Sequence, residues 1–200
     1  MARFSVCLAA IALAFAAAAG ARDLAAERGE MLVARADLPD PNFSDSVILV
    51  THSEDAGTAG LIVNRPTNVP VSSLFPDLDK LASLPDTIWF GGPVGVGQIV
   101  FLLRADTQPR DSVQVMHGLY LSESGALLRE LLGRAKPTEG LRIYAGSAGW
   151  MPAQLKSEMT RGDWHRLAGD PDLVFSRRPE TLWRELDARA NSIQARASLH

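Results

Sequence analysis

The sequence predicts a single compact domain of the α+β (mixed α/β) class. Two continuous runs of apolar, mostly β-branched residues, at 47–50 and 61–63, are typical of buried strands. Apolar residues at helical spacing occur later, at 127–132 and 182–186. Strands and helices interleave irregularly, and no internal repeat or linker divides the chain, so one domain over residues 22–190 fits best.

Strands are expected where apolar or alternating residues run between turn-forming residues. The polar segment 53–58 contains a glycine and predicts a hairpin between the first two buried runs. Asn64-Arg65-Pro66 ends the second run, because proline donates no hydrogen bond to a strand ladder. The expected strands are 31–34, 47–50, 61–63, 88–90, 99–103, 113–121 and 141–145.

Helices are expected mainly in the second half of the chain. Ser122 can cap a helix that buries the leucines of 127–132 and stops by Pro137. Residues 191–200 carry no periodic apolar face and are expected to form a disordered tail. The other expected helices lie near 71–75, from Pro152, and from Pro179 over Leu182, Trp183 and Leu186.

The first 21 residues have the pattern of a cleavable secretory signal. Arg3 supplies a basic start, residues 4–21 have no charged side chain, and Ala19-Gly20-Ala21 forms an A-x-A site. Cleavage between Ala21 and Arg22 is therefore expected, followed by export to the periplasm. The alternative is a retained anchor, which the alanine-rich composition disfavours, because a spanning helix needs about 20 strongly apolar residues.

Composition narrows the possible functions. The chain's one cysteine, Cys7, lies in the signal, so the exported domain is expected to have no thiol for a disulfide, a nucleophile or a metal. The formal net charge is −3. The arginines of 177–189 are explained more simply as the solvent-exposed start and face of a helix than as a nucleic-acid-binding surface. Nucleic acid is therefore not an expected partner. No apolar run after residue 21 is long enough to cross a membrane.

Five blocks of residues follow one another along almost the whole chain after the signal. They are Gly29-x-Met31-Leu32-Val33-Ala34 with Leu38, Asp40-Pro41, Phe43 and Ser46-Val47-Ile48-Leu49; Gly57 with Gly60-Leu61-Ile62-Val63-Asn64-Arg65-Pro66; Gly91-Gly92-Pro93-Val94; Ala148-Gly149-Trp150 with Gln154-Leu155, Glu158 and Trp164; and Phe175 with Pro179-Glu180 and Trp183. In this order they resemble the bacterial YqgE/AlgH family. The resemblance implies one domain with a mixed, partly barrel-like sheet flanked by helices, and no established enzymatic activity.

Some members of that family are labelled as transcriptional regulators, so the resemblance also implies a regulator as an alternative function. The chain departs from the family pattern at three places. Relatives usually lack a signal peptide, they tend to have an Asp-Arg-Gly-like turn where this chain has Gly97-Gln98-Ile99, and they often carry a basic residue at the position of Asp45. Export would separate the protein from DNA, so the first departure argues against the regulator.

Ser147 is the candidate nucleophile. Ala145-Gly146-Ser147-Ala148-Gly149 resembles a variant of the nucleophile elbow, with a predicted strand before it and a predicted helix after it. A serine hydrolase using Ser147 is therefore an alternative function. The downstream histidines are His165, which is beside Asp163, and His200 on the expected tail, and neither suits a separated triad. The competing interpretation is a tight turn that needs small residues.

Other site types are not supported by spacing. His52, Glu54 and Asp55 offer metal-ligand atoms but fit no known ligand spacing, so no metal is expected. Gly92 and Gly97 have the spacing of a phosphate loop, but Gln98 stands in place of its lysine, and no cofactor is expected. The glycines at 91–97 indicate a tight turn, or else an open backbone notch that a partner could approach.

The most suggestive polar residues lie at the ends of predicted strands, where rigid scaffolds present binding groups. Asn64 and Arg65, Gly91 and Gly92, and Gly149 and Trp150 are expected to meet at one rim of the sheet, with Gln154 adding an amide. Arg65 would supply fixed charge and Trp150 a broad apolar face. The competing interpretation is that Trp150 is buried and Arg65 is held by a structural carboxylate. The leading prediction is an exported, non-catalytic module that binds a protein or a small ligand.

Overall fold

The computed structural model describes residues 29–54 and 57–197. The expected signal, with its cleavage site at Ala21 and Arg22, lies outside these residues. The described chain contains ten strands: β1 (Glu30–Ala34), β2 (Val47–Glu54), β3 (Gly57–Ile62), β4 (Pro66–Pro70), β5 (Thr87–Phe90), β6 (Val94–Arg104), β7 (Val113–Met116), β8 (Leu119–Ser122), β9 (Leu141–Trp150) and β10 (Trp164–Ala168). Its helices are α1 (Gly125–Leu132), α2 (Gln154–Arg161), α3 (Pro171–Val174) and α4 (Pro179–Ala197), with short 3-10 helices η1 (Val71–Leu74) and η2 (Asp79–Leu81).

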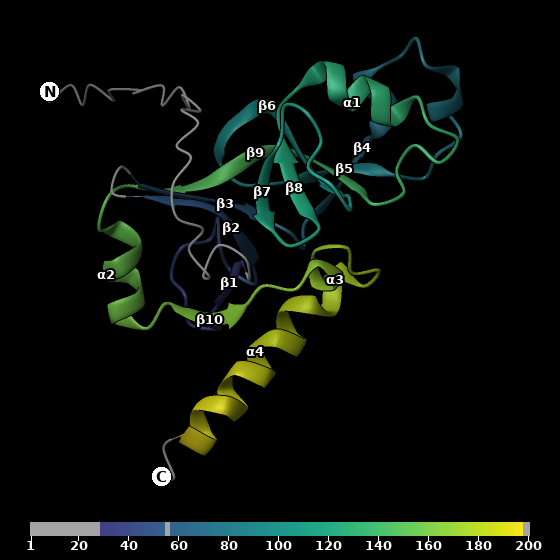
Figure 1. Ribbon diagram of the computed structural model, residues 1–200. Coiled ribbons are helices and arrows are strands. Elements are labelled where there is room, and N and C mark those ends of the chain that lie inside the picture. Colours follow the sequence, from purple (N-terminus) through teal and green to yellow (C-terminus); the bar gives the residue numbers. More distant parts are fainter. Residues whose placement is uncertain (1–28, 55–56, 198–200) are drawn as a thin grey trace, which may run out of the picture.

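One mixed sheet organises these elements. Its strand order is β10-β1-β2-β3-β9-β6-β8-β7, and β4 and β5 branch from it, with β5 parallel to β9. The sheet curls into a half-barrel in which β7 approaches β2, as Figure 1 shows. Gly29, just before β1, packs directly on the side chain of Met116 in β7, so these two parts of the sheet are in contact. The result confirms the predicted α+β domain with a partly barrel-like sheet.

Three apolar clusters fill the two faces of this sheet. The first lies inside the curl and includes Met31, Leu49, Leu61 and Tyr144, with Leu182 and Leu186 of α4 packed against it. The second joins β6, β8 and β9 to the leucines at 128, 131 and 132 of α1. The third lies on the outer face and joins β1, β2, β3, β9 and β10 to α2. Among the described helices, none is both long enough and apolar enough to cross a membrane.

Strand β9 holds the sheet together. It pairs with β6 from Leu141 to Ser147 on one edge, with β5 in parallel at Tyr144 and Ala145, and with β3 from Ala148 to Trp150. Gly91 and Gly92 lie beside this strand, and Gly149 and Trp150 are within it. The position of β9 therefore decides how far these four residues are buried.

Several sequence-based boundaries were wrong. The expected strand 113–121 is a hairpin of β7 and β8, because Gly118 has φ = +70° and allows the chain to reverse. The cap of α1 is Ser124, whose hydroxyl accepts a hydrogen bond from the Leu127 amide, and not Ser122. Strand β10 was not expected at all. Residues 191–197, expected to be a disordered tail, continue helix α4.

Candidate functional site

Arg65 ties its strand end to a distant loop. Its guanidinium donates to the main-chain oxygens of Asn42 and Ser44, at 2.5 and 2.6 Å. Burial lowers the pKa of Arg65, and the neighbouring charge of Asp45 acts in the opposite direction. The partner of Arg65 is thus a pair of carbonyls rather than the carboxylate that the competing interpretation named. Two donors of the Arg65 guanidinium are therefore occupied by contacts within the protein.

Asn64 supports the same loop from the other side. The Asn64 side-chain oxygen accepts a hydrogen bond from the Val47 amide at 2.8 Å. The Asn64 side-chain nitrogen donates to the main-chain oxygen of Asp45 at 2.9 Å. Asp45 has φ = 54°, a left-handed conformation that asparagine and aspartate tolerate better than most residues. Asn64 therefore stabilises a strained loop where it enters β2.

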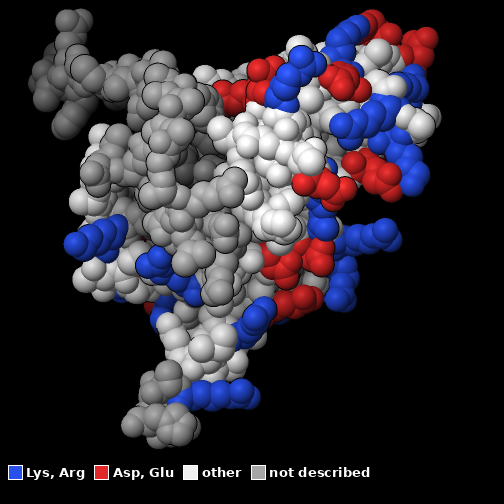
Figure 2. Space-filling model, in the orientation of Figure 1, with Lys and Arg blue, Asp and Glu red and all other residues white. Residues whose placement is uncertain are grey.

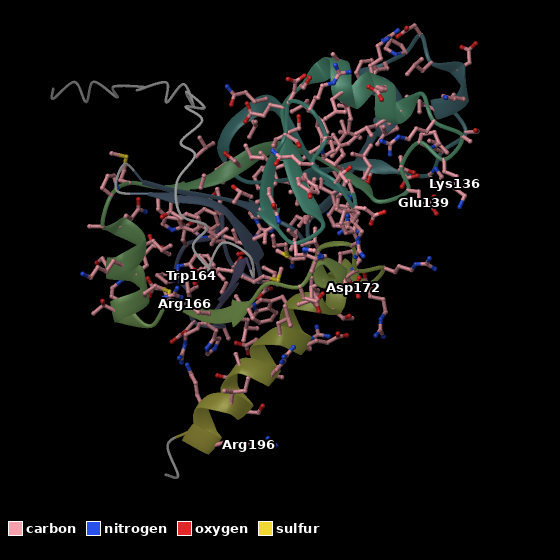
Figure 3. The ribbon with its side chains drawn as sticks, in the orientation of Figure 1. Lys136, Glu139, Trp164, Arg166, Asp172 and Arg196 are labelled. Carbon is pink, nitrogen blue, oxygen red and sulfur yellow. The ribbon has the colours of Figure 1, made fainter. Side chains whose placement is uncertain are left out.

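Trp150 lies in an aromatic cluster on the outer face of the sheet. Its ring centroid is 5.9 Å from those of Phe43 and Trp164, and Phe43 and Trp164 are 5.9 Å apart (Trp164 is labelled in Figure 3). Rings this close touch one another, so no cation fits between them as in an aromatic cage. Trp150 is only 4% exposed. The expectation that Trp150 presents an apolar surface to a partner is therefore wrong.

Glu158 of α2 anchors this aromatic cluster. One carboxylate oxygen accepts from the indole nitrogens of both Trp150 and Trp164, at 2.8 and 2.9 Å. The other oxygen accepts from Gln154 at 2.9 Å, and the Gln154 oxygen accepts from the Met151 amide at 3.0 Å. The predicted amide of Gln154 is thus engaged at the start of α2. This network fixes α2 over the end of β9.

The Gly91-Gly92 pair is buried against β9. A Cβ at Gly91 would lie 2.2 Å from the Gly146 oxygen, and one at Gly92 would lie 2.3 Å from the carbonyl carbon of Ser147. Gly92 also has φ = +148°. These glycines allow two backbones to touch, and they do not form the open notch considered from the sequence.

Several of the predicted rim residues are linked by contacts within the protein. Arg65 binds the carbonyls on both sides of Phe43, and Phe43 packs on Trp150. The Ile62 amide donates to the Gly91 oxygen at 2.9 Å. Of the seven proposed ligand-binding residues, Gly149 and Gln154 are exposed, and Trp150, Gly91 and Gly92 are buried. The contacts given for Arg65, Trp150, Gly91 and Gly92 therefore serve the packing of the domain.

Ser147 lies within β9, opposite Val94 of β6, and not at a strand-to-helix elbow. The expected turn is wrong, because the glycines on both sides of Ser147 let β9 continue to Trp150. His165 is in β10, four strand positions from β9, which is about 19 Å along the sheet. The His165 Nε2 atom lies 3.3 Å from an Asp187 oxygen beneath α4. His165 is therefore not placed to act as the general base for Ser147.

A patch of exposed residues without charge lies where β6 bulges away from β9. It consists of Val94–Gln98, Gly149 and Met151, and is called the mouth patch here. Val94, Val96 and Met151 are 53%, 58% and 66% exposed. A Cβ at Gly149 would touch the Val94 side chain at 3.5 Å, so the two strands contribute to one surface. In Figure 2 charged side chains gather at the upper right, over the end that carries α1, while much of the central area is uncharged.

The backbone of the mouth patch is irregular. Val94 pairs with Ser147, but the next pair is Ile99 with Ala145, so four residues of β6 bulge away from one residue of β9. Gly95 in this bulge has φ = +61°. Beyond Ser147, the described pairing of β9 is with β3 alone. The mouth patch thus combines exposed apolar side chains with an interrupted strand ladder.

Comparison with known proteins identifies the family. The AlgH-like family model matches residues 31–193. The chain belongs to the AlgH-like family. A UPF0301 protein of Streptomyces avermitilis is 37% identical over 173 residues, covering 84% of this chain and 88% of the relative. A UPF0301 protein of Mycobacterium tuberculosis H37Rv is 35% identical over 159 residues, covering 78% of each chain.

Solved structures agree with the AlgH-like fold. The AlgH protein of Pseudomonas aeruginosa has a TM-score of 0.67 and 25% identity, covering 86% of this chain and 92% of that one. A Corynebacterium diphtheriae protein has a TM-score of 0.58 and 25% identity, covering 73% and 78%. The names of these relatives state no activity, substrate or partner. The predicted YqgE/AlgH resemblance is confirmed.

The AlgH-like domain also contains a stacked cluster that the sequence-based reasoning missed. The Arg142 guanidinium lies 3.7 Å from the ring centroid of Trp89 and 5.6 Å from that of Phe175, and Arg104 lies 4.7 Å from Phe175. Arg142 also donates to the Val174 and Ser176 main-chain oxygens, and burial lowers its pKa. The alternation at 141–145 placed Arg142 and Tyr144 on one strand face, which was the available signal.

This stacked cluster attaches the segment between α3 and α4 to the half-barrel, and every named contact is internal. Arg104 additionally pairs with Asp172 of α3 at 2.6 Å (Asp172 is labelled in Figure 3). Within residues 29–54 and 57–197, no three His, Cys, Asp or Glu side chains are placed to hold a metal ion. Val94, Val96 and Met151 of the mouth patch are the three most exposed large apolar side chains in the part of the chain that the structure describes.

Proposed function

We propose that this AlgH-like protein is an exported, non-catalytic binding module that takes a protein partner at the mouth patch. The observation that supports this proposal is the exposed segment Val94–Gln98, five consecutive residues without charge that include the four-residue bulge, beside exposed Gly149 and Met151. Exposed apolar side chains that cluster on a protein surface often mark an interaction site. Export is supported by the uncharged segment 4–21 and the A-x-A site that follows it.

The form of the patch favours an extended, uncharged polypeptide segment as the partner. An added strand would satisfy backbone groups where the β6–β9 ladder is interrupted, and its apolar side chains would lie on Val94, Val96 and Met151. Gly95, Gly97 and Gly149 leave room for close backbone approach. A charged ligand has no complementary group in this patch.

The test begins with crosslinking in the native host. A photoreactive residue at Val96 should give a specific adduct in the periplasmic fraction, and the same residue at Ile193, which is half exposed on α4, should not. The adduct is identified by mass spectrometry and its binding measured with purified components. Val96→Asp should weaken that binding at least tenfold while Ile193→Asp leaves it unchanged. A cytosolic chain with residues 1–21 intact would refute export, and equal adducts at both positions would refute the surface.

A further inference from the structure

We infer that a cavity between the start of β7 and the end of β8 binds a primary alkylammonium ion. The cavity has a volume of about 350 Å³, and pockets that bind small organic molecules begin at about 300 Å³. It is lined by residues 111–113, which lead into β7, and by residues 121–124, which run from β8 to the cap of α1 (Figure 1). None of these residues belongs to the mouth patch, so this second site does not depend on the partner proposed there.

The register of β7 and β8 places two carboxylates opposite each other at the rim of this cavity. Val113 pairs with Leu121 in the antiparallel ladder, and two residues further out along both segments stand Asp111 and Glu123. The segments still touch at this level, because the Ser122 hydroxyl donates to the main-chain oxygen of Asp111 at 2.5 Å. Opposite residues of an antiparallel pair have Cα atoms about 5 Å apart, so one cation can contact both carboxylates.

The described protein supplies no cation to these two carboxylates. Within residues 29–54 and 57–197, the side chains of Asp111 and Glu123 are in no ion pair and no hydrogen bond. The adjacent basic residue, Arg110, does not line the cavity. Like charges that face each other across a strand pair are destabilising, and a bound cation would remove this repulsion while gaining charge-assisted contacts. The rim of the cavity therefore favours a positively charged ligand.

The serine hydroxyls of the cavity already serve contacts within the protein. The Ser112 hydroxyl donates to the Pro109 main-chain oxygen at 2.6 Å, and the Ser122 hydroxyl donates to the Asp111 oxygen. The Ser124 hydroxyl accepts from the Leu127 amide and caps α1. The ionised groups on the cavity wall are the two carboxylates, which accept hydrogen bonds and repel anions.

The apolar side of the cavity distinguishes an alkylammonium ion from a metal ion. Val113 and Leu121 form this side and belong to the edge of the first apolar cluster. A calcium ion needs about six to eight oxygen ligands, which this wall does not offer. A primary ammonium has three N–H donors, enough to contact both carboxylates. Its alkyl tail would bury apolar surface against Val113 and Leu121.

Titration of the full chain with n-pentylammonium chloride, followed by NMR of the backbone amides, tests the site. Saturable shifts should centre on residues 111–113 and 121–124. n-Pentanol keeps the tail without the charge, and methylammonium keeps the charge without most of the tail, so each should bind at least about tenfold more weakly. Equal affinity for either analogue would overturn the inference, as would the absence of saturable shifts at tens of millimolar n-pentylammonium.

Matched charge variants assign the binding to the two carboxylates. Asp111→Asn with Glu123→Gln removes both charges at nearly constant shape, and asparagine tolerates the φ of 56° at position 111. This variant should bind n-pentylammonium at least about tenfold more weakly, with a urea midpoint that is unchanged or raised. Asp106→Asn with Glu130→Gln removes the same charge from exposed positions outside the cavity and should change the affinity by less than about twofold. Equal affinities of the two double variants would overturn the site.

Discussion

Phe43 stacks on Trp150 with their ring centroids 5.9 Å apart and their planes inclined by 18°. The carbonyls of Asn42 and Ser44, on either side of Phe43, are held by Arg65. The Asn64-Arg65 and Gly149-Trp150 motifs are therefore connected through the loop that carries Phe43. Arg65 positions a loop, and the loop covers the tryptophan. This relationship assigns stability to residues that the sequence suggested for binding, and it leads to the first prediction.

Arg65→Ala should lower the free energy of unfolding by about 2–3 kcal/mol, because two hydrogen bonds to a charged donor are lost and the Asn42–Ser44 loop is released. Urea denaturation measures this change. Arg65→Lys should recover only part of it, since a lysine cannot reproduce the two-pronged contact. An alanine variant as stable as the wild type would contradict the structural role.

Glu158→Ala should cost about 2–4 kcal/mol, because the indole nitrogens of Trp150 and Trp164 both lose their acceptor in a buried cluster. Glu158→Gln keeps one carbonyl oxygen in place and should cost less than half as much. Thermal unfolding followed by tryptophan fluorescence reports both the stability and the cluster. A larger cost for the glutamine than for the alanine variant would show that this hydrogen-bonding scheme is wrong.

Gly92→Ala should prevent folding or destabilise the protein by more than about 3 kcal/mol. The added Cβ would meet the Ser147 backbone at 2.3 Å, and φ = +148° is unfavourable for any L side chain. Gly97→Ala is the matched control, because a Cβ there has nothing within 4 Å, and it should change stability by about 0.5 kcal/mol or less. Soluble yield and urea midpoints distinguish the two variants.

Ser147→Ala should change stability by no more than about 1 kcal/mol, as expected for a strand serine that loses at most one hydrogen bond. A fluorophosphonate probe should leave the wild-type serine unlabelled, because His165 is four strands away and under α4. Mass spectrometry of the probe-treated protein checks this. Stoichiometric labelling at Ser147 would restore the hydrolase alternative.

Tyr144→Phe should make the protein more stable than the wild type at alkaline pH. Burial raises the pKa of Tyr144, and the neighbouring Arg142 guanidinium acts on it more weakly in the opposite direction. In the unfolded chain this hydroxyl ionises near pH 10, so the wild type loses stability as the pH rises above that value. The variant should match the wild type within about 1 kcal/mol at pH 7 and exceed it above pH 10. Tyr120→Phe is the control, and denaturation at both pH values makes the comparison.

Local sequence determined much of the fold. The runs 47–50 and 61–63 became β2 and β3, and the leucines at 128, 131 and 132 became the buried face of α1. These elements could be predicted because side-chain periodicity and turn chemistry act over a few residues. The ordered blocks also indicated the AlgH-like family, although no single block was specific.

Tertiary structure decided which residues are available to a partner. Trp150 and Val94 both stand beside glycines near a strand end, yet Trp150 is 4% exposed and Val94 is 53% exposed. The difference arises because β9 continues through its glycines to pair with β3, while β6 bulges away at Gly95. Burial depends on strand registers between segments far apart in the chain, and a local pattern does not contain that information.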